Sequence, residues 1–450
     1  MSGIELALTG FGLMLGAIFL RVPIALAMAL TGFFGTWYVL GHPQSTLAQL
    51  KTLSYESFSN QGLSIIPLFL LMGQFATKTG MSAALFEAAN DWLGHRKGGV
   101  AMASVGACAG FGAVCGSSLA TASTMGQVAL PEMRKRGYSE SLSTGVLAAG
   151  GTLGILIPPS IILVIYAILA EQNIVKLFLA ALVPGILAAL GYILTVAIYV
   201  RLRPGSAETA PRVPYSDRLK TFARTWPVIV IFGLTIGGII GDWNWGKPGP
   251  QALFTPNEAA AFGAIATLVY GILTRQLSWS GFKEAIFETA KTTGMIFFIL
   301  LGAEIFKTFL ALSRAPDLLA DWVSTAGFAP LQVLAVMLIT YLIFGCVMDS
   351  LSMILLTVPI FLPIIETLNF GLTPEETLLW FGVLALVATE VGLITPPVGM
   401  NLFIINGVAG DIPMARTYRG VTPFVVSDLL RIGILVAFPA ITLWLVQVSF

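Results

Sequence analysis

The stretch Phe111-Gly-Ala-Val-Cys-Gly-Ser-Ser118, followed by Gly154-Ile-Leu-Ile-Pro-Pro-Ser160, decides how this chain folds. A similar arrangement returns in the second half as Phe344-Gly-Cys-Val-Met-Asp-Ser-Leu351 and Gly392-Leu-Ile-Thr-Pro-Pro-Val398. Each copy places a glycine- or serine-containing break, and then a double proline, inside strongly apolar sequence. Free backbone groups at such breaks are tolerated in a membrane only around a cavity or inside protein. Paired breaks in two halves of a chain indicate a transporter's binding site.

The composition excludes an ordinary soluble protein with one apolar core. Of the 450 residues, 56% are hydrophobic and only 10% are charged, which predicts an all-α polytopic membrane protein. The net charge of +1 comes from short clusters between apolar runs, so we expect no nucleic-acid partner. The start of the chain lacks a basic region and a cleavage site, which favours a first spanning helix over a removed signal peptide.

Two apolar stretches, about 99–132 and 330–366, are interrupted centrally and are predicted to form re-entrant helical hairpins. Two others, about 142–170 and 377–408, contain the double prolines and are predicted to be broken helices. The expected organisation is scaffold helices at 1–60, a first repeat at 61–200, a cytoplasmic linker at 201–226, scaffold helices at 227–277 and a second repeat at 278–450.

The second repeat is expected to be inverted relative to the first. Gly73 and Gly302 lie in matching helices of the two copies. The number of membrane crossings counted between these helices makes them run in opposite directions across the membrane. Basic clusters collect on the cytoplasmic side, so the hairpin flanked by Arg96-Lys97 and Arg134-Lys135-Arg136 opens there and the other opens outside. The tract from Gly241 to Pro250 is then external. Chance similarity between glycine-rich helices is the alternative, which the matched order of helix, hairpin and broken helix disfavours.

Oxygen-bearing groups gather at the breaks. Carbonyls and hydroxyls at a helix break can bind a hard cation such as Na⁺, and half-helix N-termini can bind an anion. Without histidine or cysteine ligands, these oxygens do not suit a transition metal. The candidate cation ligands are Ser117, Ser118, Thr121, Gly154, Asp349, Ser350, Thr395 and Gly399. The candidate substrate contacts are Ser117, Pro158, Ser160, Asp349, Pro396 and Asn401. Any one hydroxyl could instead hydrogen-bond between helices, worth about 0.6 kcal/mol per pair.

Two acidic residues lie close to the second pair of breaks. A carboxylate at the centre of a membrane segment costs at least ~2.5 kcal/mol, so it usually faces a cavity. We expect Asp349, which aligns with Gly116 of the first copy, to act as a ligand or charge partner. Glu390 either shares that role or braces the broken helix. Asn401 and Gly399 are expected to face the second hairpin.

Signatures of an enzyme are absent from the sequence. It has no G-x-x-x-x-G-K-[ST] loop for ATP, and its only histidines, His42 and His95, are too far apart for an H-E-x-x-H zinc site. A secondary transporter without a cofactor is therefore expected, whereas a channel or an intramembrane enzyme is disfavoured.

Several motifs in order resemble the large membrane subunit of tripartite ATP-independent periplasmic (TRAP) transporters. They are Ser117-Ser118-x-Ala-Thr121, Pro131-Glu-Met-x-x-x-Gly-Tyr138, Leu153-Gly-Ile-Leu-Ile-Pro-Pro-Ser160, Phe254-Thr-Pro-x-Glu-Ala-Ala-Ala261 and Gly392-Leu-Ile-Thr-Pro-Pro-Val-Gly-x-Asn-Leu-Phe403. The resemblance implies an elevator-type, sodium-driven importer of an organic acid in a bacterial inner membrane. It places cation sites near Ser117, Ser118 and Thr121 and near Asp349 and Ser350, completed by the double-proline breaks.

The same resemblance implies two protein partners, a small membrane subunit and a periplasmic substrate-binding protein. The tract after Gly241 is longer than expected in the family, which leaves the docking of these partners open. A self-sufficient Na⁺/carboxylate symporter of related architecture remains the alternative.

Overall fold

The computed structural model describes residues 3–241 and 252–450, and these residues form an all-α structure. The predicted external tract lies outside the described residues except for Gly241. The N-terminal helices are α1 (Gly3–Phe19), α2 (Ile24–Leu40), α3 (Pro43–Ser59), a 3₁₀ turn η1 (Gln61–Ser64), α4 (Ile65–Lys78) and α5 (Met81–Leu93). The central helices are α11 (Tyr215–Ala223), α12 (Trp226–Ile240) and α13 (Pro256–Leu273).

The first half contains a helical hairpin followed by a broken helix. The hairpin consists of α6 (Gly99–Cys115) and α7 (Ser118–Lys135). The broken helix consists of α8 (Glu140–Leu156) and α9 (Ile161–Leu169), which meet at 46°. The long helix α10 (Ile174–Leu202) follows. Pro158 and Pro159 are joined by a cis peptide bond in the break between α8 and α9.

The second half has the same order of elements. After α14 (Trp279–Ser313) and α15 (Ala315–Thr325) comes a hairpin of α16 (Pro330–Gly345) and α17 (Ser350–Thr367). The next pair, α18 (Pro374–Leu393) and α19 (Met400–Ala409), flanks the second double proline, which is also cis. The chain ends with α20 (Met414–Ala437) and α21 (Ala440–Ser449). Both halves thus present a hairpin and then a helix that stops at a Pro-Pro pair.

By length and composition, five of the described helices could cross a membrane, or seven if each of two bent helix pairs counts as one span. Large apolar side chains such as Leu190 and Leu194 of α10 are exposed on the outside of the bundle, at 59% and 60%. Exposed apolar helix surface of this kind is what lipid requires of a protein surface.

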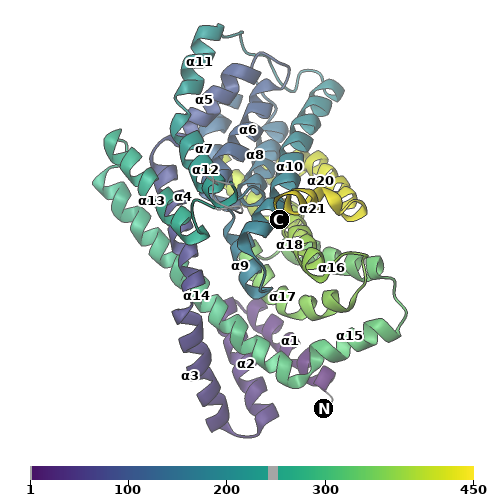
Figure 1. The fold of residues 1–450 in the computed structure, drawn as a ribbon. Helices are drawn as coiled ribbons and strands as arrows, with labels where there is room; N and C mark the ends of the chain where they lie inside the picture. Colours follow the sequence, from purple (N-terminus) through teal and green to yellow (C-terminus); the bar gives the residue numbers. More distant parts are fainter. Residues whose placement is uncertain (1–2, 242–251) are drawn as a thin grey trace.

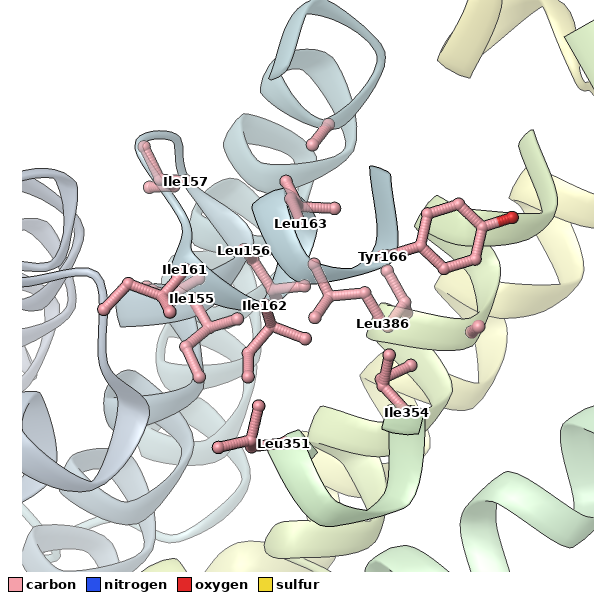
Figure 2. Close-up of a cluster of buried hydrophobic side chains, with 14 of the residues drawn as sticks. Ile155, Leu156, Ile157, Ile161, Ile162, Leu163, Tyr166, Leu351, Ile354 and Leu386 are labelled. Carbon is pink, nitrogen blue, oxygen red and sulfur yellow. The ribbon is translucent and has the colours of Figure 1, made fainter. Parts of the chain in front are cut away.

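The two broken helices and two hairpins pack into one body, while α14 runs along its side. Figure 1 shows the long α14 passing beside α2 and α3, and it also packs against α4. In the body, Figure 2 shows apolar side chains of α8 and α9, such as Ile155 and Ile162, beside Leu351 and Ile354 of α17. The Tyr166 hydroxyl of α9 donates a 2.7 Å hydrogen bond to the Leu378 carbonyl of α18. These contacts join elements of the two halves into a single core.

Candidate functional site

Each hairpin turns at a tip with a capped helix behind it. In the first tip (residues 116–118), Gly116 has a φ of +63°, which favours glycine, and Ser117 caps α7 by accepting the Ala120 N–H at 3.4 Å. In the second tip (residues 346–350), Asp349 caps α17 by accepting the Ser352 N–H at 3.1 Å. Asp349 therefore takes the structural place of Ser117, and the sequence alignment of Asp349 with Gly116 was wrong by one residue.

The two tips border one cavity of about 150 Å³, called here the tip cavity. Its wall includes Ser117 and Ser118 of the first tip and Asp349 and Ser350 of the second. Four predicted site residues, from opposite halves of the sequence, are thus brought together. Because these residues begin α7 and α17, two helix N-termini with their positive dipole ends meet at the same cavity.

A third side of the tip cavity was missed by the sequence analysis. Thr292, Met295 and Ile296 of α14 line it, and their spacing places them on one face of that helix. These positions follow Lys291 in a helix without a proline break, and no pattern in the sequence marks them as part of a site. Only the packing of α14 beside the hairpins identifies them.

Behind the first tip, the backbone of α8 approaches α7 closely at Gly154. A Cβ placed on Gly154 would lie 2.4 Å from Thr121 Oγ1 and 2.7 Å from the Ser117 carbonyl oxygen. Thr121 is 0% exposed, and its hydroxyl lies beside the Cys115 thiol without an oxygen or nitrogen partner among the described residues. Two oxygens therefore converge on a place that only glycine leaves open. We call this place the first-tip cradle.

Asn401 lies behind the first tip, beside Gly151 of α8 and one helical turn from the first-tip cradle, and not at the second tip. Helix α19 packs against α7 and α8, and the Asn401 amide nitrogen lies 3.3 Å from the Ala148 carbonyl of α8, to which it donates a hydrogen bond. A Cβ on Gly151 would lie 3.1 Å from both that nitrogen and the Ser118 carbonyl oxygen. The Asn401 Oδ1 atom is buried, with no partner in the part of the chain that the structure describes. The expectation that Asn401 faces the second tip was therefore wrong.

The remaining predicted residues lie at the breaks and not on the tip cavity. Ser160 is buried and caps α9 through the Leu163 N–H, and Pro158 is buried beside it. In the second break, Pro396 is exposed and the Thr395 hydroxyl donates to the Val391 carbonyl at 2.6 Å. Gly399 has a φ of +64°, and its N–H donates to the Cys346 carbonyl at 3.0 Å. Gly399 therefore ties the second break to the second tip.

Glu390 of α18 lies behind both tips and is fully buried. The Ser350 hydroxyl donates to its Oε1 at 2.6 Å, and the Ser118 side chain lies beside the same carboxyl group. The Oε2 atom has no hydrogen-bond partner within the described ranges. Bracing and cation binding, the two roles considered from the sequence, are both compatible with this position.

A buried charged cluster near Glu390 was also missed. Arg431 and Asp428 of α20 form an ion pair at 2.9 Å, with 5% and 2% of their side chains exposed. The Tyr192 hydroxyl of α10 donates to Asp428 at 2.7 Å and lies 2.9 Å from the Thr152 hydroxyl of α8. The i, i+3 spacing of the two charges within apolar sequence was a signal that could have found the pair.

The chemistry of the site is that of hard oxygen donors and helix N-termini. Among the described residues, no group of three or more histidine, cysteine, aspartate or glutamate side chains could hold a metal ion. The first-tip cradle offers a hydroxyl and a carbonyl oxygen, with the Asn401 amide about one helical turn away, and such oxygens suit an alkali cation. The tip cavity has room for a small molecule, whose anionic groups the two helix N-termini would attract.

Comparison with known proteins identifies the family. The family model for the DctM component of tripartite ATP-independent periplasmic transporters matches residues 11–441. The C4-dicarboxylate TRAP transporter large permease protein DctM of Pseudomonas aeruginosa is 35% identical over 413 residues, 92% of each chain. The sialic acid TRAP transporter large permease protein SiaM of Vibrio cholerae is 31% identical over 387 residues, 86% of each chain.

A solved structure has a similar fold. The YdaH transporter of Alcanivorax borkumensis gives a TM-score of 0.63 at 16% identity, over 88% of this chain and 89% of that one. The all-α membrane fold and the family resemblance expected from the sequence are confirmed, and the relatives are permeases, not enzymes. The chain belongs to the DctM family, the large membrane component of tripartite ATP-independent periplasmic transporters.

Proposed function

We propose that this chain is the transporting subunit of a sodium-driven importer for an organic acid in a bacterial inner membrane. A periplasmic substrate-binding protein delivers the acid, and a small membrane subunit completes the complex. The observation that carries the proposal is the convergence of two hairpin tips, from opposite halves of the chain, on one tip cavity. Paired breaks around a shared site are typical of secondary transporters built from inverted repeats.

Sodium fits the first-tip cradle by the chemistry of its donors. Thr121 Oγ1 and Asn401 Oδ1 are buried without an oxygen or nitrogen partner in the described ranges, and the Ser117 carbonyl oxygen lies beside the first of them. A buried oxygen without a partner costs about 1–3 kcal/mol, and a bound cation removes that cost. Na⁺ would supply positive charge there, while Gly154 keeps the space open.

An organic anion fits the tip cavity. The N-termini of α7 and α17 meet there, and the hydroxyls of Ser117, Ser118 and Ser350 can donate hydrogen bonds to a carboxylate. The relatives named above carry a C4-dicarboxylate and sialic acid in their names, both acids, which supports this substrate class.

Alternating access is proposed to occur by movement of the hairpin body along α14. The helices that touch the tip cavity from outside that body, α4 and α14, pack against each other and against α2 and α13. The tips, both breaks and the charged cluster of α20 lie together on the other side. Such a division into a mobile body and a framework suits an elevator mechanism, with an inverted pair of repeats providing one gate on each side.

The test is uptake into liposomes that contain this chain and its small membrane subunit, with the binding protein added outside. Radiolabelled succinate is the first probe, followed by sialic acid. We expect uptake only with an inward Na⁺ gradient and only with the binding protein present. Uptake without Na⁺ contradicts the proposed coupling. Uptake with Na⁺ but without the binding protein identifies a self-sufficient Na⁺/carboxylate symporter.

A further inference from the structure

A second cavity lies between α1 and the second hairpin, and we call it the side cavity. Its volume is about 230 Å³. Phe11 of α1 and Leu310 of α14 form one side, and Phe344 of α16 and Phe361 of α17 form the other. Helix α15 contributes Leu319 to the wall and packs against both α1 and α17 (Figure 1). The side cavity shares no residue with the tip cavity, so it is a separate feature of the fold.

The wall of the side cavity is apolar. Of the described residues that line it, two are polar, Thr340 and Thr357. The Thr340 hydroxyl donates to the Val336 carbonyl at 2.9 Å, and the Thr357 hydroxyl donates to the Met353 carbonyl at 2.8 Å. A buried water needs two to four polar partners, whereas an apolar cavity of about 150 Å³ is known to stay dry and bind benzene. The side cavity therefore suits hydrocarbon and does not suit water or an organic anion.

The side cavity is continuous with the lipid-facing surface of the bundle. Leu8 of α1 is part of its wall and is 61% exposed. On α16, Ile339 and Ile343 are exposed directly beside the wall residues Thr340 and Phe344. Exposed apolar helix surface of this kind faces the hydrocarbon of a bilayer. A lipid chain can therefore reach the side cavity without crossing a polar barrier.

Helix α15 indicates the depth of the side cavity in the membrane. Its Leu319 lines the cavity, and Trp322 on the next turn is exposed and packs on Phe328 with ring centroids 5.6 Å apart. Tryptophan is enriched where the bilayer meets water, at the level of the lipid headgroups. A phospholipid with its headgroup at this level would have its acyl chains beside the side cavity.

We propose that the side cavity binds one acyl chain of a membrane phospholipid. Lipid tails are as apolar as the wall, so the chain gains no hydrophobic free energy on entering. It gains dispersion contacts with wall atoms on both sides, which a cavity without an occupant lacks.

The bound chain also stabilises the conformation described here. This step rests on the proposed function, in which the hairpin body moves along α14. Such a movement separates Phe344 and Phe361 of the hairpin from Phe11 and Leu310 on the other side of the cavity. The chain would then lose its contacts on one side, so its binding slows the departure of the second hairpin.

Photolabelling measures the binding of the chain without transport. The full-length protein is reconstituted in liposomes that contain phosphatidylglycerol with a diazirine near the end of one acyl chain. We expect illumination to label Ile360 and Phe361, the residues of α17 that line the side cavity, as located by peptide mass spectrometry.

Two variants fill the side cavity with an aromatic ring. Ala7→Phe does so from α1 and Thr340→Phe from α16, because both residues line the wall. Each should abolish the labelling of α17. Ala335→Phe is the matched control, because it adds the same ring at an exposed position of α16 outside the wall, and it should be labelled as the wild type is.

The labelling has three outcomes that would overturn the site. The first is a wild-type chain without label on α17, and the second is label that persists in both ring variants. The third is label that disappears when the small membrane subunit is added, which would mean that the partner covers the cavity. If one ring variant does not fold, the other decides.

Uptake into liposomes tests the effect on movement separately. A ring that permanently fills the side cavity should slow sodium-dependent uptake in Ala7→Phe, while Ala335→Phe should match the wild type. An unchanged rate in Ala7→Phe overturns the stabilising role of the chain. A wild-type protein that shows no uptake contradicts the proposed function instead, and the photolabelling still decides whether the acyl-chain site exists.

Discussion

Gly392 of α18 lies against Gly345 of α16 so closely that a Cβ on Gly392 would be 2.6 Å from the Gly345 Cα atom. The first half repeats this contact, since a Cβ on Gly112 of α6 would be 2.4 Å from the Gly154 Cα atom of α8. Both pairs join the first helix of a hairpin to the helix that precedes a double proline. The close approach sets how near each tip lies to the break behind it.

Gly154→Ala should therefore damage cation binding at the first-tip cradle. The added methyl group would overlap Thr121 Oγ1 at 2.4 Å and the Ser117 carbonyl oxygen at 2.7 Å. Overpacking of this kind costs about 1–3 kcal/mol. We expect a lower thermal midpoint in KCl and a much smaller increase on addition of NaCl. Gly106→Ala on α6 is the control, because a Cβ there meets no atom within 4 Å. An unchanged Na⁺ response in Gly154→Ala would show that the cradle holds no cation.

Thr121→Val should separate stability from sodium binding. The Thr121 hydroxyl is buried with only the Cys115 thiol, a weak partner, beside it among the described residues, so an apolar side chain of the same shape removes a cost of up to about 1–3 kcal/mol. The variant should be at least as stable as the wild type in KCl and yet gain less from NaCl. Loss of stability in KCl would mean that the hydroxyl has a partner in the folded protein.

The hairpins and breaks could be predicted from the sequence because glycine and proline act locally. Helix α6 begins at Gly99 and α16 at Pro330, as the apolar stretches indicated, and the chain turns beside Ser117 and Asp349. Which side chains meet across the fold could not be predicted in this way. Asn401 crosses to the first tip because α19 packs on α7 and α8, a contact between segments more than 250 residues apart. Such contacts depend on tertiary packing, which no local pattern encodes.

Asp349→Asn tests whether the second tip does more than cap a helix. Asparagine caps helices about as well as aspartate. The free energy of unfolding in KCl should therefore change by less than about 0.5 kcal/mol. If Asp349 takes part in coupling through its charge at the tip cavity, sodium-dependent uptake into liposomes should fall at least tenfold. Ser117→Asn is the matched change at the first tip. Wild-type uptake rate and sodium dependence in Asp349→Asn would limit Asp349 to its capping role.

The ion pair of Asp428 and Arg431 should contribute to stability because each buried charge neutralises the other. The attraction between the two charges should not by itself add to the free energy of unfolding. Removing one member leaves the other buried without a countercharge, which costs about 3–5 kcal/mol, whereas replacing both by apolar residues is often neutral. Asp428→Leu alone should therefore lower the thermal midpoint strongly, and Asp428→Leu combined with Arg431→Met should restore most of it. Tyr192→Phe removes one hydrogen bond to Asp428 and should have an intermediate effect. If the double variant is no more stable than Asp428→Leu, then Asp428 is not the only group that balances the charge of Arg431. The electrostatic interaction between Arg431 and Glu390 would then account for the difference.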